Sequence, residues 1–209
     1  MQRRDFSAGL LAAGALSLAP AAFAQKAGTD YRVLSQPAPV EAPAGKIEVV
    51  EFFWYSCPHC NAFEPTLEAW SKKLPADVVL RRVPVAFRDD FVPQQRLFYT
   101  LEALGRLDLH GKVFQAIHQE RQPTNREDTI LAWAQKNGLD RAKFQELYNS
   151  FSVQTKTRRA SQLQDAYRVE GVPALGVAGR FYTDGEMTGQ MPRALQVVDY
   201  LVGEIRQGR

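Results

Sequence analysis

The chain has 209 residues, a formal net charge of +3 and only two cysteines, Cys57 and Cys60. Hydrophobic residues make up 45% of the sequence and charged residues 23%, which is typical of a folded globular protein and excludes a disordered or collagen-like chain. Two cysteines exclude a protein held together by several disulfides, and the small net charge gives no argument for nucleic acid binding. The length allows one compact unit with an insertion, or two domains.

The N-terminal segment has the form of an export signal. The string RRDF at residues 3–6 precedes an apolar run over residues 10–18, and the triplet AFA at residues 22–24 has the small-x-small form of a cleavage site. The apolar run is too short to span a bilayer. We therefore predict a cleaved signal peptide over residues 1–24 and a mature chain that begins at Gln25, in an oxidising compartment. The two arginines fit either a twin-arginine signal or a general secretory signal.

Residues 25–93 follow a strand–helix–strand order. Residues 47–55 (IEVVEFFWY) are β-branched or aromatic and almost continuously apolar, which is typical of a central strand buried on both faces. Residues 61–74 have a helical pattern, and residues 78–87 read as a second strand. Pro84 in this second strand indicates an irregular or edge position, because proline cannot donate a ladder hydrogen bond.

Residues 94–170 contain only helical patterns. The string TNRE at residues 124–127 has the form of a capping box in front of one helix, and Asp140 can cap the next helix. His110 and His118 also fall in this block, and we expect both on helix surfaces.

Strand patterns return in residues 171–209. Residues 173–177 and 180–183 read as two strands with a hairpin turn at Ala178-Gly179 between them, and residues 192–206 read as an amphipathic helix. The whole order is β–α–β, then helices, then β–β–α. It predicts an α/β fold in which a helical block interrupts the elements of one sheet.

The reactive chemistry lies in Cys57-Pro58-His59-Cys60. At the start of a helix, positions i and i+3 face each other closely enough for the two sulfurs to bond. Free backbone N–H groups and the helix dipole favour a thiolate there, so the pKa of Cys57 should lie below that of a free cysteine. His59 adds to this effect when it is protonated or donates a hydrogen bond. Cys60, one turn deeper, should be shielded and should act when a mixed disulfide is resolved.

Three other interpretations of the cysteine pair compete with this one. A zinc site would need His110 and His118 from the distant helical block to complete the four ligands, which is an improbable assembly. A structural disulfide that closes such a short loop would constrain little chain entropy. A haem attachment site needs Cys-x-x-Cys-His, and residue 61 is Asn. The sequence therefore favours redox chemistry.

The active-site segment resembles the DsbA family of the thioredoxin superfamily. The likeness is carried by Cys57-Pro58-His59-Cys60 after Glu51-Phe52-Phe53 and before Phe63-Glu64-Pro65. It extends over the mature chain and implies a thioredoxin fold with a helical domain inserted between its β–α–β and β–β–α halves. The implied division is 25–93 and 171–209 for the two parts of the thioredoxin fold and 94–170 for the helical domain.

The resemblance also implies roles for four further residues. Val172-Pro173, ahead of a strand, resembles the family's cis-proline loop, which lies against the active disulfide and leaves the backbone at Val172 free to pair with an extended client chain. Glu51 occupies the place of a charged residue beneath the disulfide, and Arg82 that of its basic partner. Glu51 could pass protons to or from Cys60, or the two residues could form a structural ion pair.

The function that the resemblance implies is a periplasmic thiol:disulfide oxidoreductase, which donates the Cys57–Cys60 disulfide to reduced exported proteins. A membrane quinone reductase similar to DsbB would reoxidise it, with no organic cofactor or metal, and nothing in the sequence demands more than a monomer. A disulfide isomerase or reductase is the enzymatic alternative, because the same four residues work in both directions. A polypeptide-binding chaperone without redox chemistry is the alternative from another class.

Overall fold

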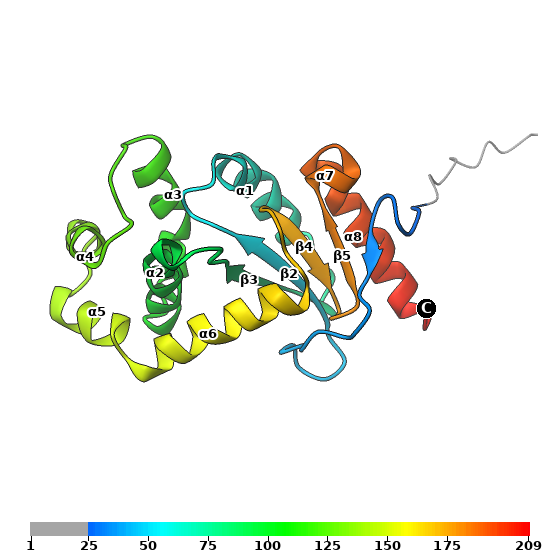
Figure 1. Ribbon diagram of the computed structural model, residues 1–209, viewed down its shortest axis with the longest axis horizontal. Helices are drawn as coiled ribbons and strands as arrows, with labels where there is room; N and C mark the ends of the chain where they lie inside the picture. The colour runs from blue at the N-terminus through cyan, green and yellow to red at the C-terminus, as the bar shows by residue number, and fades with distance from the viewer. Residues whose placement is uncertain (1–24) are drawn as a thin grey trace, which may run out of the picture.

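The computed structural model describes residues 25–209, and the expected signal peptide over residues 1–24 lies outside the described residues. A twisted sheet occupies the middle of the molecule, with a group of helices beside it and further helices against its faces (Figure 1). The strands are β1 (Arg32–Val33), β2 (Ile47–Phe53), β3 (Val78–Pro84), β4 (Ala174–Val177) and β5 (Phe181–Asp184). Their order in the sheet is β1-β5-β4-β2-β3.

Strand β2 lies inside the sheet, as its apolar sequence predicts. It pairs in parallel with β3 and antiparallel with β4, and every residue after Ile47 is buried. β3 is at the edge of the sheet and ends at Pro84, which agrees with the edge position predicted from that proline. The turn between β4 and β5 has positive φ angles at Ala178 (52°) and Gly179 (67°), the backbone of a tight hairpin turn.

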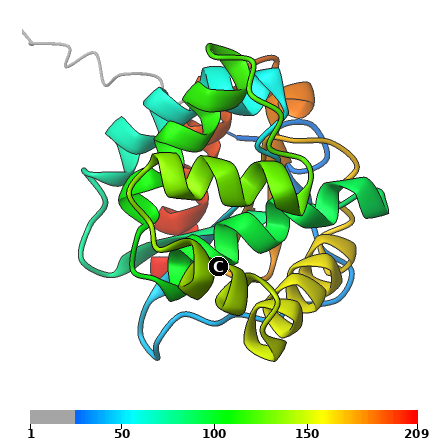
Figure 2. The same cartoon turned by 90° about the vertical axis from the view of Figure 1, so that its left-hand side faces the viewer.

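The helices follow the predicted succession. They are α1 (Pro58–Ser71), α2 (Val92–Ala103), α3 (His110–His118), α4 (Glu127–Lys136), α5 (Arg141–Tyr148), α6 (Phe151–Ala166), α7 (Gly185–Thr188) and α8 (Met191–Arg206), with short 3-10 helices at Asp89–Phe91 and Leu107–Leu109. Helices α2 to α5 form a body beside the sheet, seen face-on in Figure 2, and the long α6 leads back from it. None of the helices in residues 25–209 is long and apolar enough to cross a membrane.

Two apolar cores follow from the alternation of side chains along β2. Val49 packs with α1 and α8 on one face of the sheet. Val50 and Phe52 point to the other face and belong to the core shared with the inserted helices. On that face the ring of Tyr167 lies directly against Gly176, where a Cβ atom would come within 2.4 Å of the ring. The sheet is therefore covered on both sides, as the continuous apolar run of β2 requires.

Several local predictions need correction. The capping box at residues 124–127 is wrong: α4 begins at Glu127 with Arg126 as its N-cap, and the Arg126 N–H donates to the Thr129 hydroxyl at 3.4 Å. The cap of α5 is confirmed, because the Asp140 carboxylate accepts the Lys143 N–H at 2.7 Å. The short helix α7 has no counterpart in the predicted elements.

The prediction of a surface position for His110 is also wrong. Only 6% of the residue is exposed, and aromatic rings of Phe53, Phe98 and Phe114 surround its imidazole with centroids 5.1 to 5.8 Å away. His118 is partly buried.

Candidate active site

The redox pair sits where β2 ends and α1 begins. Cys57 is the N-cap of α1, with the extended backbone angles φ −79° and ψ 118°, and Pro58 is the first helical residue, where its missing N–H costs nothing. Both cysteines are free thiols, 7% exposed at Cys57 and 0% at Cys60. Pro58 and His59, between them, are exposed. This placement agrees with the prediction from the sequence that Cys60 is shielded and Cys57 is the more accessible of the two.

The pKa of Cys57 is lowered to about 6. The largest cause is a hydrogen bond from the Cys60 thiol, and burial of the sulfur opposes it. The backbone N–H groups of Cys60 and His59 and the charge of His59 lower the pKa further. The direction was predicted from the helix N-terminus, but the sequence did not indicate that the neighbouring thiol contributes most.

The pKa of Cys60 is shifted in the opposite direction to that of Cys57. Burial raises its pKa far above the ordinary value, and the hydrogen bond to Cys57 and the charge of that sulfur add to the rise. Cys60 is therefore a thiol whenever the pair is reduced. Within one helical turn, the Cys57 sulfur is stable as a thiolate and can therefore leave as one. The Cys60 sulfur takes up a proton as soon as the disulfide breaks.

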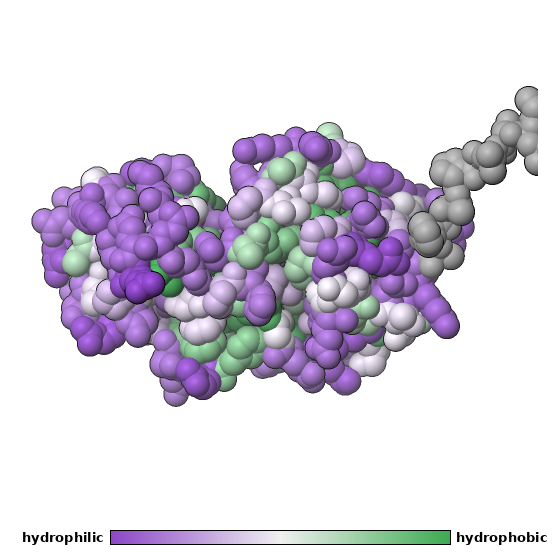
Figure 3. All heavy atoms as spheres, turned by 90° about the horizontal axis from the view of Figure 1, so that it is seen from above, coloured by the Kyte–Doolittle hydropathy of each residue, from purple (hydrophilic) through white to green (hydrophobic). Residues whose placement is uncertain are grey.

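The predicted cis-proline loop lies against this pair. The Val172–Pro173 bond is cis, and the Cys57 thiol donates to the Val172 carbonyl oxygen across 3.4 Å. Beside them is a cavity of about 940 Å³ lined by His59, Val172 and Pro173 together with residues of the β5–α7 segment and of the N-terminal region. Seen from above (Figure 3), this end of the molecule carries apolar side chains in its middle, between mostly hydrophilic surfaces.

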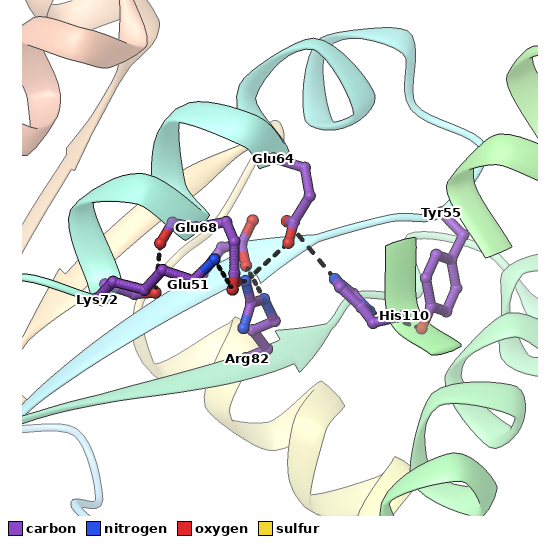
Figure 4. A network of polar contacts seen from close by, with 8 residues as sticks. Glu51, Tyr55, Glu64, Glu68, Lys72, Arg82 and His110 are labelled. Carbon is purple, nitrogen blue, oxygen red and sulfur yellow. Dashed lines mark hydrogen bonds and ion pairs between the residues drawn. The ribbon is translucent and has the colours of Figure 1, made fainter. Parts of the chain in front are cut away.

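Glu51 and Arg82 meet beneath the helix, as the family resemblance implies. They are register partners on β2 and β3, and Arg82 Nε lies 3.2 Å from Glu51 Oε2. The same guanidinium also contacts Glu64 Oε1 at 2.7 Å and Glu68 Oε2 at 3.2 Å, both on α1 (Figure 4). One arginine therefore neutralises only part of a cluster of three carboxylates.

The negative charge that Arg82 leaves unneutralised affects the pKa of Glu51. Complete burial raises the pKa of Glu51 to about 8, and repulsion by Glu64 adds to the rise, whereas Arg82 opposes it. Charge on Glu51 in turn contributes to the raised pKa of Cys60. Glu51 thus holds its proton to a higher pH than an ordinary carboxyl, and its charge, once ionised, opposes ionisation of the Cys60 thiol.

Glu64 and His110 were missed by the sequence analysis as members of this site. His110 Nε2 faces Glu64 Oε2 at 3.5 Å, and its Nδ1 is hydrogen bonded to the Tyr55 hydroxyl at 2.8 Å. A signal for the first residue was available, because Cys60, Glu64 and Glu68 are spaced by four and lie on one helix face. No local pattern marks His110, which reaches the cluster from the helical insertion.

The zinc interpretation would need the histidines near the sulfurs. Instead, His110 and His118 both contact Tyr55, through its hydroxyl and its carbonyl oxygen. Among residues 25–209, no three His, Cys, Asp or Glu side chains are grouped so that they could hold a metal ion.

Comparison with known proteins gives a consistent result. A family model described as DSBA-like thioredoxin domain matches residues 48–196. The thiol:disulfide interchange protein DsbA of Bordetella parapertussis is 48% identical over 212 residues, covering 99% of this chain and 100% of the relative. The protein of the same name from Pseudomonas aeruginosa is 40% identical over 207 residues, covering 99% of this chain and 98% of the relative.

Solved structures extend the likeness to three dimensions. The crystal structure of Pseudomonas aeruginosa DsbA matches with a TM-score of 0.83 and 42% identity, over 88% of this chain and 95% of that one. The oxidoreductase DsbA from Xylella fastidiosa matches with a TM-score of 0.80 and 31% identity, over 87% of this chain and 98% of that one. Sequence, fold and cysteine geometry agree, and the chain belongs to the DsbA family, with a thioredoxin fold that carries an inserted helical domain.

Proposed function

We propose that this protein is a periplasmic thiol:disulfide oxidoreductase that donates a Cys57–Cys60 disulfide to reduced, exported proteins. The observation that carries the proposal is that the pKa values of the two sulfurs are shifted in opposite directions. The pKa of Cys57 is lowered to about 6, and that of Cys60 is strongly raised. A stabilised Cys57 thiolate is a good leaving group and favours the reduced form of the pair, which makes the disulfide a strong oxidant. A depressed cysteine pKa and an oxidising disulfide are already established for DsbA, so the trend agrees with the family.

The reaction proceeds in two exchanges. A client thiolate attacks the Cys57 sulfur, the Cys57–Cys60 bond breaks, and Cys60 leaves with the electron pair and takes up a proton. A second client thiolate then attacks the client sulfur of the mixed disulfide and releases Cys57 as a thiolate. The client has lost two electrons and the enzyme has gained them, so the reduced enzyme must be reoxidised before another cycle.

Glu51 is proposed as the proton donor to Cys60. A carboxyl whose pKa is raised to about 8 holds a proton near neutral pH and can give it to a newly formed thiolate. Replacing Glu51 with Gln should slow the reduction of the disulfide by a client dithiol. Glu48→Gln is the matched control, since Glu48 is a buried carboxylate on the same strand, 1% exposed, on the opposite face of the sheet. Equal rates in the two variants would leave Glu51 with a structural role.

Client binding is proposed at the cis-proline loop. The cavity of about 940 Å³ beside Val172 and Pro173 has room for side chains of an extended segment whose backbone pairs with Val172. His59 lines the same cavity, so that a client cysteine placed there would lie beside Cys57. Backbone pairing of this kind tolerates many sequences, as an enzyme with varied clients requires.

The partners and location follow from family membership as proposals. We propose export by the signal over residues 1–24, by the twin-arginine or the general secretory route, and reoxidation by a DsbB-like membrane quinone reductase. The reaction as written uses only the two sulfurs and acid–base side chains, without an organic cofactor or metal, and we propose that a monomer carries it out. Mass spectrometry of the exported protein should find Gln25 at its N-terminus.

The deciding experiment is the equilibrium of the Cys57–Cys60 pair with glutathione. A strongly oxidising potential supports a disulfide donor, whereas a potential near that of thioredoxin would favour a reductase. In a Cys60→Ser variant, the Cys57 thiolate should attack the disulfide of an oxidised client peptide, release one client thiolate and accumulate as a mixed disulfide that is detectable by mass, because Cys60 is no longer present to resolve it.

A chaperone without redox chemistry makes a different prediction. Cys57→Ser should then protect an unfolding client from aggregation as well as the wild type does, and the wild type should form no client disulfides. We expect the reverse for disulfide formation: Cys57→Ser abolishes it, because no other thiol in the chain can form the mixed disulfide at that position.

A further inference from the structure

The loop that connects β2 to the redox pair, residues 54–56, is held by side chains of the helical insertion and of the segment that leads into it. The indole of Trp54 stacks on the ring of Phe91 with the centroids 3.8 Å apart and the planes 4° from parallel. The amide of Gln94, on α2, donates to the Ser56 hydroxyl at 2.7 Å. Both contacts come from residues more than thirty positions further along the chain, so they join two separate parts of the fold.

The middle residue of the loop is held by α3. His118 Nε2 lies 2.8 Å from the Tyr55 carbonyl oxygen, and because a carbonyl oxygen can only accept, the imidazole must donate from Nε2. His110 Nδ1 lies 2.8 Å from the Tyr55 hydroxyl. Both the backbone and the side chain of Tyr55 are therefore fixed by one helix of the insertion.

The orientation of the Gln94 amide is set by its surroundings. Its Nε2 contacts the Thr124 carbonyl oxygen at 3.2 Å as well as the Ser56 hydroxyl, and only the nitrogen can donate to that carbonyl. The residue is 2% exposed, and its Oε1 meets no donor from residues 25–209. Its amide nitrogen therefore joins Ser56 in the loop before Cys57 to the Thr124 backbone of the insertion.

The loop is tied directly to the reacting sulfur. The Cys57 N–H donates to the Trp54 carbonyl oxygen at 3.0 Å, and the N–H groups of His59 and Cys60 that stabilise the thiolate follow within one turn. The stabilisation that backbone N–H groups give a thiolate falls steeply with distance and angle, so a small displacement of the loop would weaken it.

We propose that Gln94 and His118 are positioning residues for the redox pair: from the helical insertion they hold residues 54–56, and thereby keep Cys57 where the start of α1 stabilises its thiolate. The insertion is then part of the redox centre, in addition to covering one face of the sheet. This inference rests on the proposed function only in taking Cys57 as the reacting sulfur.

The adjacent residue supplies a matched control. Gln95 is also on α2, is 1% exposed and has a buried Oε1 without a donor in residues 25–209. Its amide donates at 2.9 Å to the Pro84 carbonyl oxygen on β3, and not to residues 54–56. Gln94→Met and Gln95→Met each remove one buried donor at nearly constant volume. The ultraviolet absorbance of the thiolate as a function of pH reports the pKa of Cys57 in each reduced protein, and the glutathione equilibrium reports the oxidising power.

Gln94→Met should raise the pKa of Cys57 and lower the equilibrium constant for reduction by glutathione about threefold, which corresponds to about half a pKa unit of lost thiolate stabilisation. Gln95→Met should change neither, although both substitutions lower thermal stability. His118→Leu, at a partly buried position, should act in the same direction as Gln94→Met and decides the matter if Gln94→Met does not fold.

Two results would overturn the proposal. An unchanged Cys57 pKa in both Gln94→Met and His118→Leu would leave these residues a purely structural role. Equal shifts in Gln94→Met and Gln95→Met would mean that any loosening of α2 disturbs Cys57. Neither result depends on proteins being the substrate, so failure of this inference is distinguishable from failure of disulfide donation, which is measured on the wild type with a reduced client.

Discussion

Two sulfurs within one helical turn bind protons very differently in this protein. The pKa of Cys57 is lowered to about 6 by donors that converge on it, whereas burial raises that of Cys60 far above the ordinary range. The residue types are the same, so the difference comes from position alone: Cys57 is the N-cap residue of α1, and Cys60 lies inside the helix. This asymmetry supports the proposed roles, in which Cys57 is the sulfur that the client attacks and Cys60 is the buried sulfur that takes up a proton.

The Cys57 thiolate should be visible in a titration. We expect the thiolate absorbance of the reduced protein to rise with a midpoint near the value of about 6, and Cys57→Ser to remove that step. His59→Ala should move the midpoint upward, because the charge of His59 is one of the groups that lower the Cys57 pKa. A midpoint above that of a free cysteine would contradict the geometry of the site.

Glu51 should make the protein less stable as the pH rises. Its pKa is raised to about 8 from an ordinary value of 4.5, so between these two values the unfolded chain has lost a proton that the native protein still binds. The stability that this carboxyl contributes is fully present at low pH and is lost through about pH 8. Glu51→Gln should remove the loss and gain on the order of 2 kcal/mol relative to wild type between acidic and mildly alkaline buffer.

Urea unfolding at the two pH values measures the Glu51 effect. The Glu48→Gln variant provides a comparison: burial raises the pKa of Glu48 too, but this carboxylate on β2 lies outside the Arg82 cluster, so the variant should keep the contribution of Glu51. Identical pH slopes for Glu51→Gln and wild type would mean that Arg82 keeps Glu51 ionised in the native protein.

The role of a residue could be predicted from the sequence only where a single local pattern indicates that role. The pair Glu51 and Arg82 was implied by the resemblance to the DsbA family, because each occupies a position where that family has a charged residue. His110 was placed on a surface because helical spacing alone does not reveal that Glu64 and Tyr55 lie across from it. Its burial depends on the packing of the insertion against α1, which is a tertiary property.

At the scale of elements, strands and long helices were predictable and short or capped segments were not. The helix α7 has four residues, too few to display a helical period. The N-cap of α4 is Arg126 because Thr124 is drawn into the interior, where it is 2% exposed and its carbonyl oxygen accepts from Gln94. The tertiary contact with Gln94 therefore keeps Thr124, a residue type that favours the N-cap position, from capping α4.

Replacing either of two glycines in different elements by alanine should change the free energy of unfolding, in opposite directions at the two positions. In Gly176→Ala, on β4, the new Cβ would lie 2.4 Å from the Tyr167 ring, and we expect a loss of about 1–3 kcal/mol in the free energy of unfolding. In Gly203→Ala, inside α8, the Cβ meets no atom within 4 Å, and we expect a gain of about 0.5–1 kcal/mol. Chemical denaturation of both variants checks the pair. A neutral Gly176→Ala would mean that the Tyr167 ring moves aside freely.

At the scale of the whole molecule, the order of elements predicted one sheet with a helical insertion. What it did not predict is how closely the insertion engages the sheet: its residues share a continuous core with Val50 and Phe52 of β2 and reach the loop before Cys57. Such contacts join residues far apart in the chain, and no periodicity encodes them.

The stability of the whole reduced protein should depend on Cys57. Its native pKa of about 6 lies below the ordinary value of 9.0, so the unfolded chain binds the additional proton between these values. The contribution is therefore present above pH 9 and is lost as the pH falls through about 6. Reduced wild type should gain up to about 4 kcal/mol relative to Cys57→Ser across this window in urea unfolding. A constant difference between the two proteins would show that Cys57 keeps its proton.

The two outer edges of the sheet have a consequence for an enzyme proposed to work among unfolded chains. On one side β1 offers only Arg32–Val33, and on the other β3 carries two adjacent arginines and closes with Pro84, which has no N–H. Short, charged and proline-ended borders resist the addition of foreign strands. Co-aggregation with unfolded clients through the sheet edges should therefore be disfavoured, which leaves the proposed pairing at Val172 as the route for an extended segment.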